Sequence, residues 1–499
     1  MKGESIFIKG RGKERWLQSF QLGRGARGDV QVLEWWALRS HADHMNVHVF
    51  RHYDIRGVAA RDLTDAFTTD LGRALGTFWR RAGKQRVALG RDCRHSSPRL
   101  RQALTAGLTE TGLEVIDVGE GPTPALYFAV FHYELDGGVQ ITGSHNPPED
   151  NGFKMMTGQD SLFGEDIQTL RRMIAERDFE VPGGGVVTEL DIVPAYIGFM
   201  EGNLRFTGPC PPFAVDAGNG AAGPLMQSVS DALGLPMHGI YMDMDGSFPN
   251  HHPDPTVPEN LEALRAKVLQ EGLAFGVAFD GDGDRLGVID ETGNILWGDR
   301  LTALFAREIL QTHPGATVLG EVKCSQVLFD DIRAQGGVPE MSPTGHSLIK
   351  ARLKETGAVL AGEMSGHIFF ADKFFGFDDA IYATLRLAEI LSERQMKVSE
   401  LIADLPTRFT TPELRTSCPD ALKVSVVQGV TEHFAKSHEV NRLDGARIAF
   451  GDGWGLVRAS NTGPVLVTRF EAGTEAELVA IRSEVEAVLA RVIAEKASA

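Results

Sequence analysis

The sequence repeats one arrangement three times, in which strand-length apolar runs alternate with helical segments until a closing apolar run stops at a polar loop. The closing runs cover residues 138–142, 273–279 and 358–361. Alternation of this kind predicts mixed or parallel sheets covered by helices. Its recurrence predicts three similar α/β domains, each ending on its closing run as the last strand, with the polar loops placed around one central cleft.

The C-terminal part of the chain follows a different pattern. Strands are predicted at 447–450 and 456–458, joined by a glycine-rich hairpin, and a helix is predicted at 474–496. This predicts a smaller α+β domain. We divide the chain into an N-terminal extension at 1–45, α/β domains at 46–190, 191–297 and 298–407, and the α+β domain at 408–499. The extension has no helical or strand period, and we interpret it as disordered or not translated.

Composition limits the partners of the chain. Its 499 residues carry a formal charge of -17, which argues against nucleic acid or an anionic membrane as a partner. No apolar run reaches the length of a membrane span, and the N-terminus lacks the apolar core of a signal peptide. The cysteines are too scattered for a disulfide framework or a zinc site, so a reduced cytoplasm is the simplest setting. They are Cys93, Cys210, Cys324 and Cys418.

The first polar loop surrounds Ser144 in the string Thr-Gly-Ser-His-Asn-Pro-Pro. Glycine before the serine and two prolines after it favour a tight loop that displays Ser144 instead of packing it. His145 is its neighbour, and Lys154 follows ten positions later. A serine in this setting can act as a covalent carrier served by a nearby acid or base. An ordinary Asn-Pro turn capped by a serine hydroxyl is the alternative, and this string alone does not decide between them.

The second polar loop places Asp280, Asp282 and Asp284 at alternate positions separated by glycines. Glycines let the backbone wrap closely, so the carboxylates can converge on one Mg²⁺ ion. The string also resembles a calcium EF-hand loop. Arg285 stands where that loop needs glycine, however, and the flanks are predicted strands where an EF-hand has helices. A merely solvated acidic turn is disfavoured because adjacent carboxylates repel one another.

Two further motifs complete a recognisable set. Gly-Glu363-Met-Ser365-Gly-His367 follows the third closing run, and Arg458-Ala-Ser460-Asn-Thr lies in the C-terminal domain. Together with the serine and aspartate loops, in this order, they resemble the α-D-phosphohexomutase superfamily, and most closely its bacterial phosphomannomutase/phosphoglucomutase branch. The resemblance extends from about Val47 to the C-terminus.

The resemblance implies a mechanism. Ser144 is phosphorylated in the resting enzyme and passes its phosphoryl group to a hexose 1- or 6-phosphate, and the bisphosphorylated sugar then reorients and returns its other phosphate. Mg²⁺ is expected to bind the three aspartates and an oxygen of the phosphoserine. Glucose 1,6-bisphosphate or mannose 1,6-bisphosphate is the expected activator and intermediate. Lys154 and His367 are the candidate general acid and base, and Arg56 and Arg285 the candidates that stabilise the transferred charge.

The resemblance also implies a set of substrate-binding residues, with a phosphate cradle at 458–462. The family usually has a second threonine where this chain has Gly463. Small hexose phosphates are the expected partners, and a monomer or weak homo-oligomer the expected state. The expected substrate-binding residues are Tyr53, Arg285, Lys323, His346, Glu363, Ser365, Arg458, Ser460, Asn461 and Thr462.

Three other functions compete with this one. A phosphoglucosamine mutase differs only in its sugar, and Met364 argues against it because those enzymes more often carry glutamine there. A sugar-phosphate binding protein would keep the fold without turnover. A magnesium phosphatase with an aspartyl nucleophile in the Asp280 loop would leave Ser144, Glu363 and Arg458 without a role.

Overall fold

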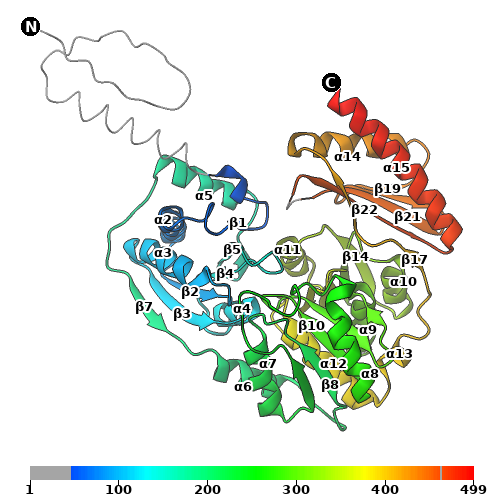
Figure 1. Ribbon diagram of the computed structural model, residues 1–499, viewed down its shortest axis with the longest axis horizontal. Coiled ribbons are helices and arrows are strands. Elements are labelled where there is room, and N and C mark those ends of the chain that lie inside the picture. Colours follow the sequence, from blue (N-terminus) through cyan, green and yellow to red (C-terminus); the bar gives the residue numbers. More distant parts are fainter. Residues whose placement is uncertain (1–45, 461–462, 499) are drawn as a thin grey trace, which may run out of the picture. The chain divides into compact units, whose positions relative to one another are not determined.

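The computed structural model describes residues 46–460 and 463–498 (Figure 1). The predicted N-terminal extension therefore lies outside the described residues. The described chain forms four sheets, of which the first three are mixed and the fourth is antiparallel. The prediction of three similar α/β domains followed by an α+β domain is confirmed.

The first sheet has the strand order β1-β5-β4-β2-β3-β7, and β6 pairs with β5. Helices α2 and α3 pack against each other beside it, and Figure 1 shows them in blue. Its strands are β1 Ile55–Val58, β2 Arg86–Arg91, β3 Glu114–Glu120, β4 Gly137–Ile141, β5 Asp150–Thr157, β6 Asp160–Ser161 and β7 Val186–Glu189. Its helices are η1 Val47–Val49, α2 Asp65–Arg81, α3 Ser97–Glu110, α4 Thr123–His132 and α5 Glu165–Glu176. The next helix, α6 Val193–Asn203, packs against α7 Gly223–Leu233 beside the second sheet.

The second and third sheets have the orders β12-β11-β10-β8-β9 and β14-β13-β15-β16. The second comprises β8 Phe213–Asp216, β9 Met237–Ile240, β10 Phe275–Phe279, β11 Leu286–Asp290, β12 Ile295–Leu296, α7 Gly223–Leu233, η2 Pro258–Leu261 and α8 Glu262–Glu271. The third comprises β13 Thr317–Glu321, β14 Val338–Ser342, β15 Leu360–Gly362, β16 Ile368–Phe370, α9 Gly298–Thr312, α10 Gln326–Ala334, α11 His346–Thr356, α12 Ala380–Arg394 and α13 Val398–Leu401.

The three mixed sheets share one strand arrangement. A shared part of each sheet has three parallel strands and one antiparallel strand, in the orders β5-β4-β2-β3, β11-β10-β8-β9 and β16-β15-β13-β14. The sequence predicted that each closing run is the last strand of its unit. This prediction was wrong, because β5, β11 or β16 follows each closing run and pairs beside it. Ser144, Asp280 and Glu363 lie in the loops of these three returns. The shared topology places the three polar loops at the same edge of their sheets, where α/β proteins bind ligands.

The fourth sheet has the order β17-β22-β21-β20-β19, with β18 paired to β22. The predicted hairpin is confirmed, since β20 and β21 pair up to Phe450 and Gly453. Among the described residues, no helix is long and apolar enough to span a membrane. The elements are β17 Phe409–Thr410, β18 Leu414–Ser417, β19 Val440–Asn441, β20 Ala446–Phe450, β21 Gly453–Ala459, β22 Val465–Ala472, α14 Asp420–Phe434 and α15 Glu475–Ala497.

Candidate active site

Ser144 lies in the β4–β5 loop and is 1% exposed, so the sequence prediction of a displayed serine was wrong. The loop of Asp280 covers it. Gly281 packs so closely that a Cβ there would lie 2.4 Å from the Ser144 carbonyl oxygen. The Ser144 hydroxyl donates a hydrogen bond to Asp280 Oδ2 at 2.7 Å and lies 3.1 Å from His145 Nδ1. Two loops far apart in sequence therefore meet at this hydroxyl.

The three aspartates of the β10–β11 loop are fully buried, and one carboxylate oxygen of each lies within 4.8 Å of the others. Asp280 Oδ1 accepts the backbone N–H groups of Asp284 at 3.1 Å and Arg285 at 3.2 Å, which folds the loop back on itself. Burial, together with repulsion from its two neighbouring carboxylates, raises the pKa of Asp280 well above its ordinary value. A cation would relieve this repulsion.

Lys154 on β5 provides part of that relief. Its ammonium donates to Asp282 Oδ2 at 2.7 Å and also to Asp284 Oδ2. Burial opposes the charge of Lys154, but the aspartates outweigh burial and raise its pKa. Burial likewise opposes ionisation of Asp282, yet the ammonium and the hydroxyl of Thr123 hold the pKa of this carboxyl below its usual range. Thr123, at the start of α4, was not among the predicted site residues.

The remaining carboxylate oxygens fit a metal ion. Asp282 Oδ1 and Asp284 Oδ1 are buried without a hydrogen-bond partner in the described part of the chain. Buried carboxylate oxygens are hydrogen-bonded or bind a cation, because an unpaired buried charge is costly. Several convergent carboxylate oxygens are the ligands that hard divalent cations prefer. The aspartate loop therefore has the donor set of a divalent-cation site.

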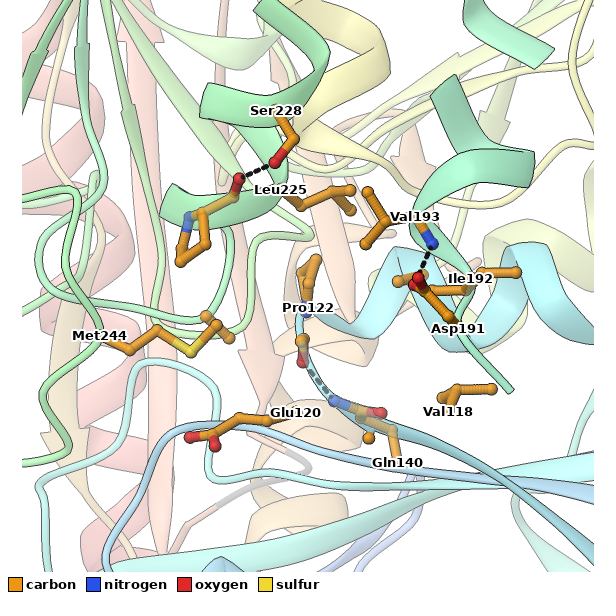
Figure 2. Close-up of a pocket in the computed structure, with 15 residues that line it drawn as sticks. Val118, Glu120, Pro122, Gln140, Asp191, Ile192, Val193, Leu225, Ser228 and Met244 are labelled. Carbon is orange, nitrogen blue, oxygen red and sulfur yellow. Dashed lines mark hydrogen bonds between the residues drawn. The ribbon is translucent and has the colours of Figure 1, made fainter. Parts of the chain in front are cut away.

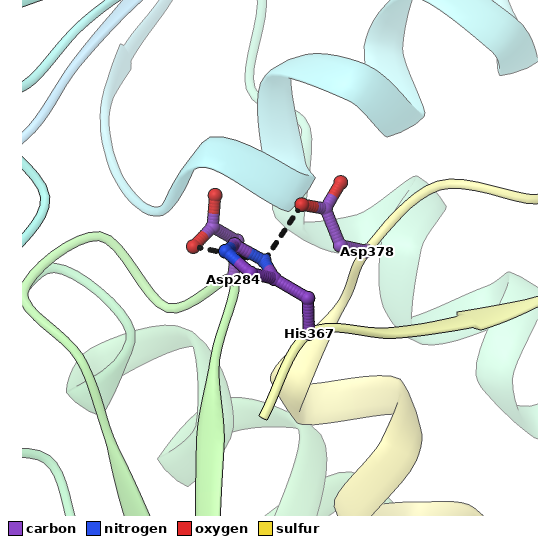
Figure 3. Close-up of side chains that lie close together, drawn as sticks. All are labelled: Asp284, His367 and Asp378. Atoms are coloured by element: carbon purple, nitrogen blue, oxygen red, sulfur yellow. Dashed lines mark ion pairs between the residues drawn. The ribbon is translucent and has the colours of Figure 1, made fainter. Parts of the chain in front are cut away.

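His367, directly before β16, lies between Asp284 and a carboxylate that the sequence did not predict, Asp378 (Figure 3). Its Nδ1 is 2.9 Å from Asp378 Oδ2 and 3.6 Å from Asp284 Oδ1. Its Nε2 accepts a hydrogen bond from Nε of Arg285 at 2.8 Å. Because Nε2 accepts a hydrogen bond, a proton on the ring lies on Nδ1, which faces Asp378. His367 and Asp378 thus form a histidine–aspartate pair, and together with Asp284 they also offer ligand atoms within 4.8 Å of one another.

A cluster of charged and polar groups surrounds Glu363 in the β15–β16 loop. Glu363 Oε1 accepts the backbone N–H of Gly345 at 2.7 Å, and its Oε2 accepts the Ser365 hydroxyl at 3.1 Å. Lys323 lies 3.4 Å from Glu321 and 3.2 Å from Glu413, and these acids raise its pKa against the effect of burial. The described atoms therefore place carboxylates, a hydroxyl and an ammonium together, as binding of a polar ligand requires.

His346, at the start of α11, belongs to the group around Asp378. Its ring stacks on that of His367 with centroids 5.6 Å apart, and its Nδ1 lies 3.5 Å from Asp378 Oδ2. Burial, followed by the nearby Lys350 ammonium, lowers the pKa of His346. Lys350 also lies 3.1 Å from Asp378 Oδ1. His346 is thus held as a neutral ring beside the histidine–aspartate pair.

Three predicted site residues, Tyr53, Arg56 and Arg458, form hydrogen bonds to loops of other segments. The Tyr53 hydroxyl donates to the Thr344 carbonyl at 2.6 Å, next to Gly345. Arg56 donates to Asn146 Oδ1 at 3.2 Å in the serine loop. Nε of Arg458 donates to Asp444 Oδ2 at 2.9 Å, and the same oxygen accepts the Thr344 N–H at 3.0 Å.

The rest of the predicted phosphate cradle is only partly described. The Ser460 N–H donates to the Val465 carbonyl at 3.0 Å, and this serine is buried. Asn461 and Thr462 lie outside the described residues. A Cβ at Gly463 would have no neighbour within 4 Å among the described residues, so packing against them does not require this glycine.

A cavity of about 190 Å³ lies apart from these side chains (Figure 2). It is walled by the segment after β3, the start of α6 and the helix α7, and it contains none of the predicted site residues. Figure 2 shows Gln140 beneath it, donating from Nε2 to the Gly121 carbonyl at 2.9 Å. The chemistry therefore concentrates in the polar loops and not in this cavity.

The site combines a buried serine and three carboxylates with a lysine and a histidine–aspartate pair. These are the groups that an enzyme needs for phosphoryl transfer. The chain belongs to the phosphoglucomutase/phosphomannomutase family. Its sequence matches the family models for alpha/beta/alpha domain I at residues 47–181, domain II at 203–293, domain III at 297–409 and the C-terminal domain at 410–488. The resemblance seen in the four motifs is confirmed.

Named relatives share most of the chain. A phosphomannomutase/phosphoglucomutase of Pseudomonas aeruginosa is 45% identical over 87% of this chain and 94% of its own length. A phosphoglucomutase of Neisseria gonorrhoeae is 44% identical over 88% of this chain and 96% of its own length. The crystal structure of a phosphoglucomutase/phosphomannomutase family protein from Burkholderia thailandensis has a TM-score of 0.85 and 42% identity, covering 90% of this chain and 98% of that one.

Proposed function

We propose that this enzyme interconverts the 1- and 6-phosphates of mannose, glucose or both, through a phosphorylated Ser144 and a hexose 1,6-bisphosphate intermediate. The observation that carries the proposal is the 2.7 Å hydrogen bond from the Ser144 hydroxyl to Asp280 in the aspartate loop. This contact supports the proposal because a serine hydroxyl can act as a nucleophile and the neighbouring carboxylates can bind a divalent cation. The names of the relatives at 44 to 45% identity support mannose and glucose over glucosamine.

The phosphoryl transfer needs a base and an acid. As a sugar hydroxyl attacks the phosphorus on Ser144, its proton passes to Nε2 of His367, and the bond from phosphorus to Ser144 Oγ breaks. Lys154, kept as an ammonium by its aspartates, supplies the proton to the departing Oγ. The intermediate turns round and gives its other phosphoryl group back to Ser144 by the same steps in reverse.

Arg285 has two roles in this scheme. In the structure its Nε–H donates a hydrogen bond to His367 Nε2, so this nitrogen cannot accept a proton. When it turns to the oxygens of the transferred phosphoryl group, Nε2 becomes free to accept the sugar proton, and Arg56 stabilises the same charge from the other side. Asp280, Asp282, Asp284 and a phosphoserine oxygen would hold Mg²⁺, which would neutralise part of this charge.

The substrate is held away from the reacting phosphorus. Glu363 and Ser365 bind sugar hydroxyls beside Lys323. Tyr53 and His346 lie next to this sugar-binding loop and contact the substrate there. Arg458, Ser460, Asn461 and Thr462 bind the phosphate that does not react. We assign the phosphoserine loop to a domain at 46–190, the metal loop to 191–297, the sugar loop to 298–407 and the phosphate cradle to 408–499. Glucose or mannose 1,6-bisphosphate phosphorylates Ser144 at the start, and the cytoplasm supplies the hexose phosphates.

Phosphorus NMR tests the proposal directly. Purified enzyme with Mg²⁺ and a trace of glucose 1,6-bisphosphate receives mannose, glucose or glucosamine 1-phosphate, and the 6-phosphate signal is followed. The expected result is isomerisation of mannose or glucose phosphate that Ser144→Ala abolishes. Ser392→Ala, which deletes a hydroxyl from a fully buried serine of α12, is the matched control and should remain active. Absence of isomerisation by the unmodified enzyme, or retained activity in Ser144→Ala, would refute it.

A further inference from the structure

Arg94 lies between β2 and α3, outside every predicted motif, and its side chain is fully buried. A buried guanidinium is rare unless its charge and all its N–H groups are paired. Here all five are used. Nε donates to Asp92 Oδ2 at 3.1 Å, and the four remaining N–H groups donate to backbone carbonyls of the serine loop.

The four carbonyls span the whole loop from the nucleophile to the start of β5. Nη2 of Arg94 donates to the carbonyl oxygens of Ser144 at 2.7 Å and Asn146 at 2.6 Å. Nη1 donates to those of Pro147 and, at 3.0 Å, Asp150. One rigid planar group thus fixes four peptide units, which a lysine, with three donors on a flexible stem, cannot do.

Asp92 fixes the beginning of the same loop. Its Oδ2 accepts the Thr142 hydroxyl at 2.8 Å and the Gly143 N–H at 3.2 Å, in addition to Nε of Arg94. Its Oδ1 accepts the Ser97 hydroxyl at 2.6 Å, which anchors the carboxylate to α3. The aspartate–arginine pair therefore connects the serine loop to a helix of the domain through hydrogen bonds and an ion pair.

The loop conformation needs such support. Ser144 has a φ of +50°, which is uncommon for residues other than glycine and costs about 1 kcal/mol or more. Gly143 completes the fit, because a Cβ there would lie 2.6 Å from Nε and Cζ of Arg94. The guanidinium is also covered by the Phe248 ring, with its carbon 5.2 Å from the ring centroid. Removing the guanidinium would leave the serine free to relax from its position against Asp280.

We propose that Arg94 is a positioning residue for the nucleophile: it holds the Ser144 loop so that the hydroxyl, or the phosphoryl group on it, stays aligned with the aspartate loop. This inference rests on the proposed function. Arg94 does not touch the reacting atoms, so its loss should change the rate of phosphoryl transfer more than the binding of the sugar. Misplacement of a reacting group by about 1 Å can cost about 100-fold in rate.

The test compares Arg94→Lys with the unmodified enzyme and with Arg386→Lys. Arg386 is a matched control, because it is a buried arginine whose hydrogen bonds go to Asp372 and Tyr382, away from the serine loop. We expect kcat of Arg94→Lys to fall by about 100-fold while KM stays within about threefold. Arg386→Lys should lower the melting temperature without this selective loss of kcat.

Hydrogen exchange of backbone amides is a second measurement of the order of the serine loop, and it needs no substrate. In Arg94→Lys the backbone amides of residues 145–152 should exchange faster, whereas those of β2 and β4 should keep their protection. If Arg94→Lys does not fold, Gly143→Ala replaces it, since its methyl group should displace the guanidinium. Unchanged exchange in this segment, or a fall in kcat no larger than that of Arg386→Lys, would overturn the proposal. An inactive unmodified enzyme would instead refute the proposed function, and exchange would still decide the role of Arg94.

Discussion

Replacing Gly281 by alanine tests whether the two loops must touch for the enzyme to work. Gly281 lies between two of the candidate metal ligands, and its φ is not in the left-handed region, so the backbone itself accepts alanine. The added Cβ, however, would lie 2.4 Å from the Ser144 carbonyl oxygen and 3.4 Å from Cγ of Pro253. The serine loop and the aspartate loop would have to separate.

The size of the effect follows from this distance. An ordinary contact between a Cβ and an oxygen begins near 3.4 Å, so the loops must separate by about 1 Å. A displacement of this size between reacting groups costs about 100-fold in rate, or about 2.7 kcal/mol of transition-state stabilisation. We expect kcat of Gly281→Ala to fall by that factor in an assay that follows glucose 6-phosphate formed from glucose 1-phosphate.

Gly107→Ala is the matched control for this experiment. Gly107 faces α2 from α3, and a Cβ there would lie 2.1 Å from the Thr69 carbonyl oxygen, away from the site. This variant should lose stability through overpacking but keep its kcat, when both are assayed below their melting temperatures. If Gly281→Ala kept a kcat within about threefold of the unmodified enzyme, the close approach of the two loops would not be needed for transfer.

Two further predictions concern buried charges. Burial raises the pKa of Asp379 to about 7, although Tyr196 and the Tyr382 N–H donate to it. Since the pKa of Asp379 is higher in the folded than in the unfolded state, the stability it contributes is present at low pH. This stability falls as pH rises toward 7, by about 2 kcal/mol between pH 5 and 7. Asp379→Asn keeps the helix cap and should remove this fall in the free energy of unfolding, measured with urea at pH 5, 6 and 7. Equal pH dependence in both proteins would contradict the prediction. Lys154→Met should lose about 3 to 5 kcal/mol of folding stability without metal, because Asp282 and Asp284 then lack their ammonium partner. Magnesium should raise its melting temperature more than that of the unmodified enzyme, and a smaller rise would count against the shared site.

The motif positions could be predicted because they depend on strand ends. Ser144 and Asp280 each follow a buried parallel strand, and such strand ends meet at one edge of an α/β sheet. The antiparallel returns were harder to see. Strand β5 carries Gly152 and Lys154 within a short run after two prolines, so its sequence lacks an uninterrupted apolar pattern. Its burial comes from pairing with β4, the strand before it, and with β1, which lies far from it in sequence.

The supporting polar residues could not be predicted for a related reason. Arg94, Thr123 and Asp378 act through single side chains that reach another segment, and no periodicity marks such contacts. Asp378 also precedes the helix cap Asp379, so the pair reads in sequence as an ordinary helix start. The burial of Ser144 was missed because its cover is Gly281, which has no side chain and packs through its backbone.

The central claim is that Ser144 carries the phosphoryl group. The most direct measurement is mass spectrometry of the enzyme after incubation with Mg²⁺ and glucose 1,6-bisphosphate, followed by peptide mapping at neutral pH. The account predicts one phosphoryl group on the peptide that contains Ser144, lost when excess mannose or glucose 1-phosphate is added, and absent from Ser144→Ala. A phosphoryl group on Asp280 or Asp282, or isomerisation by an enzyme that is never phosphorylated, would contradict it.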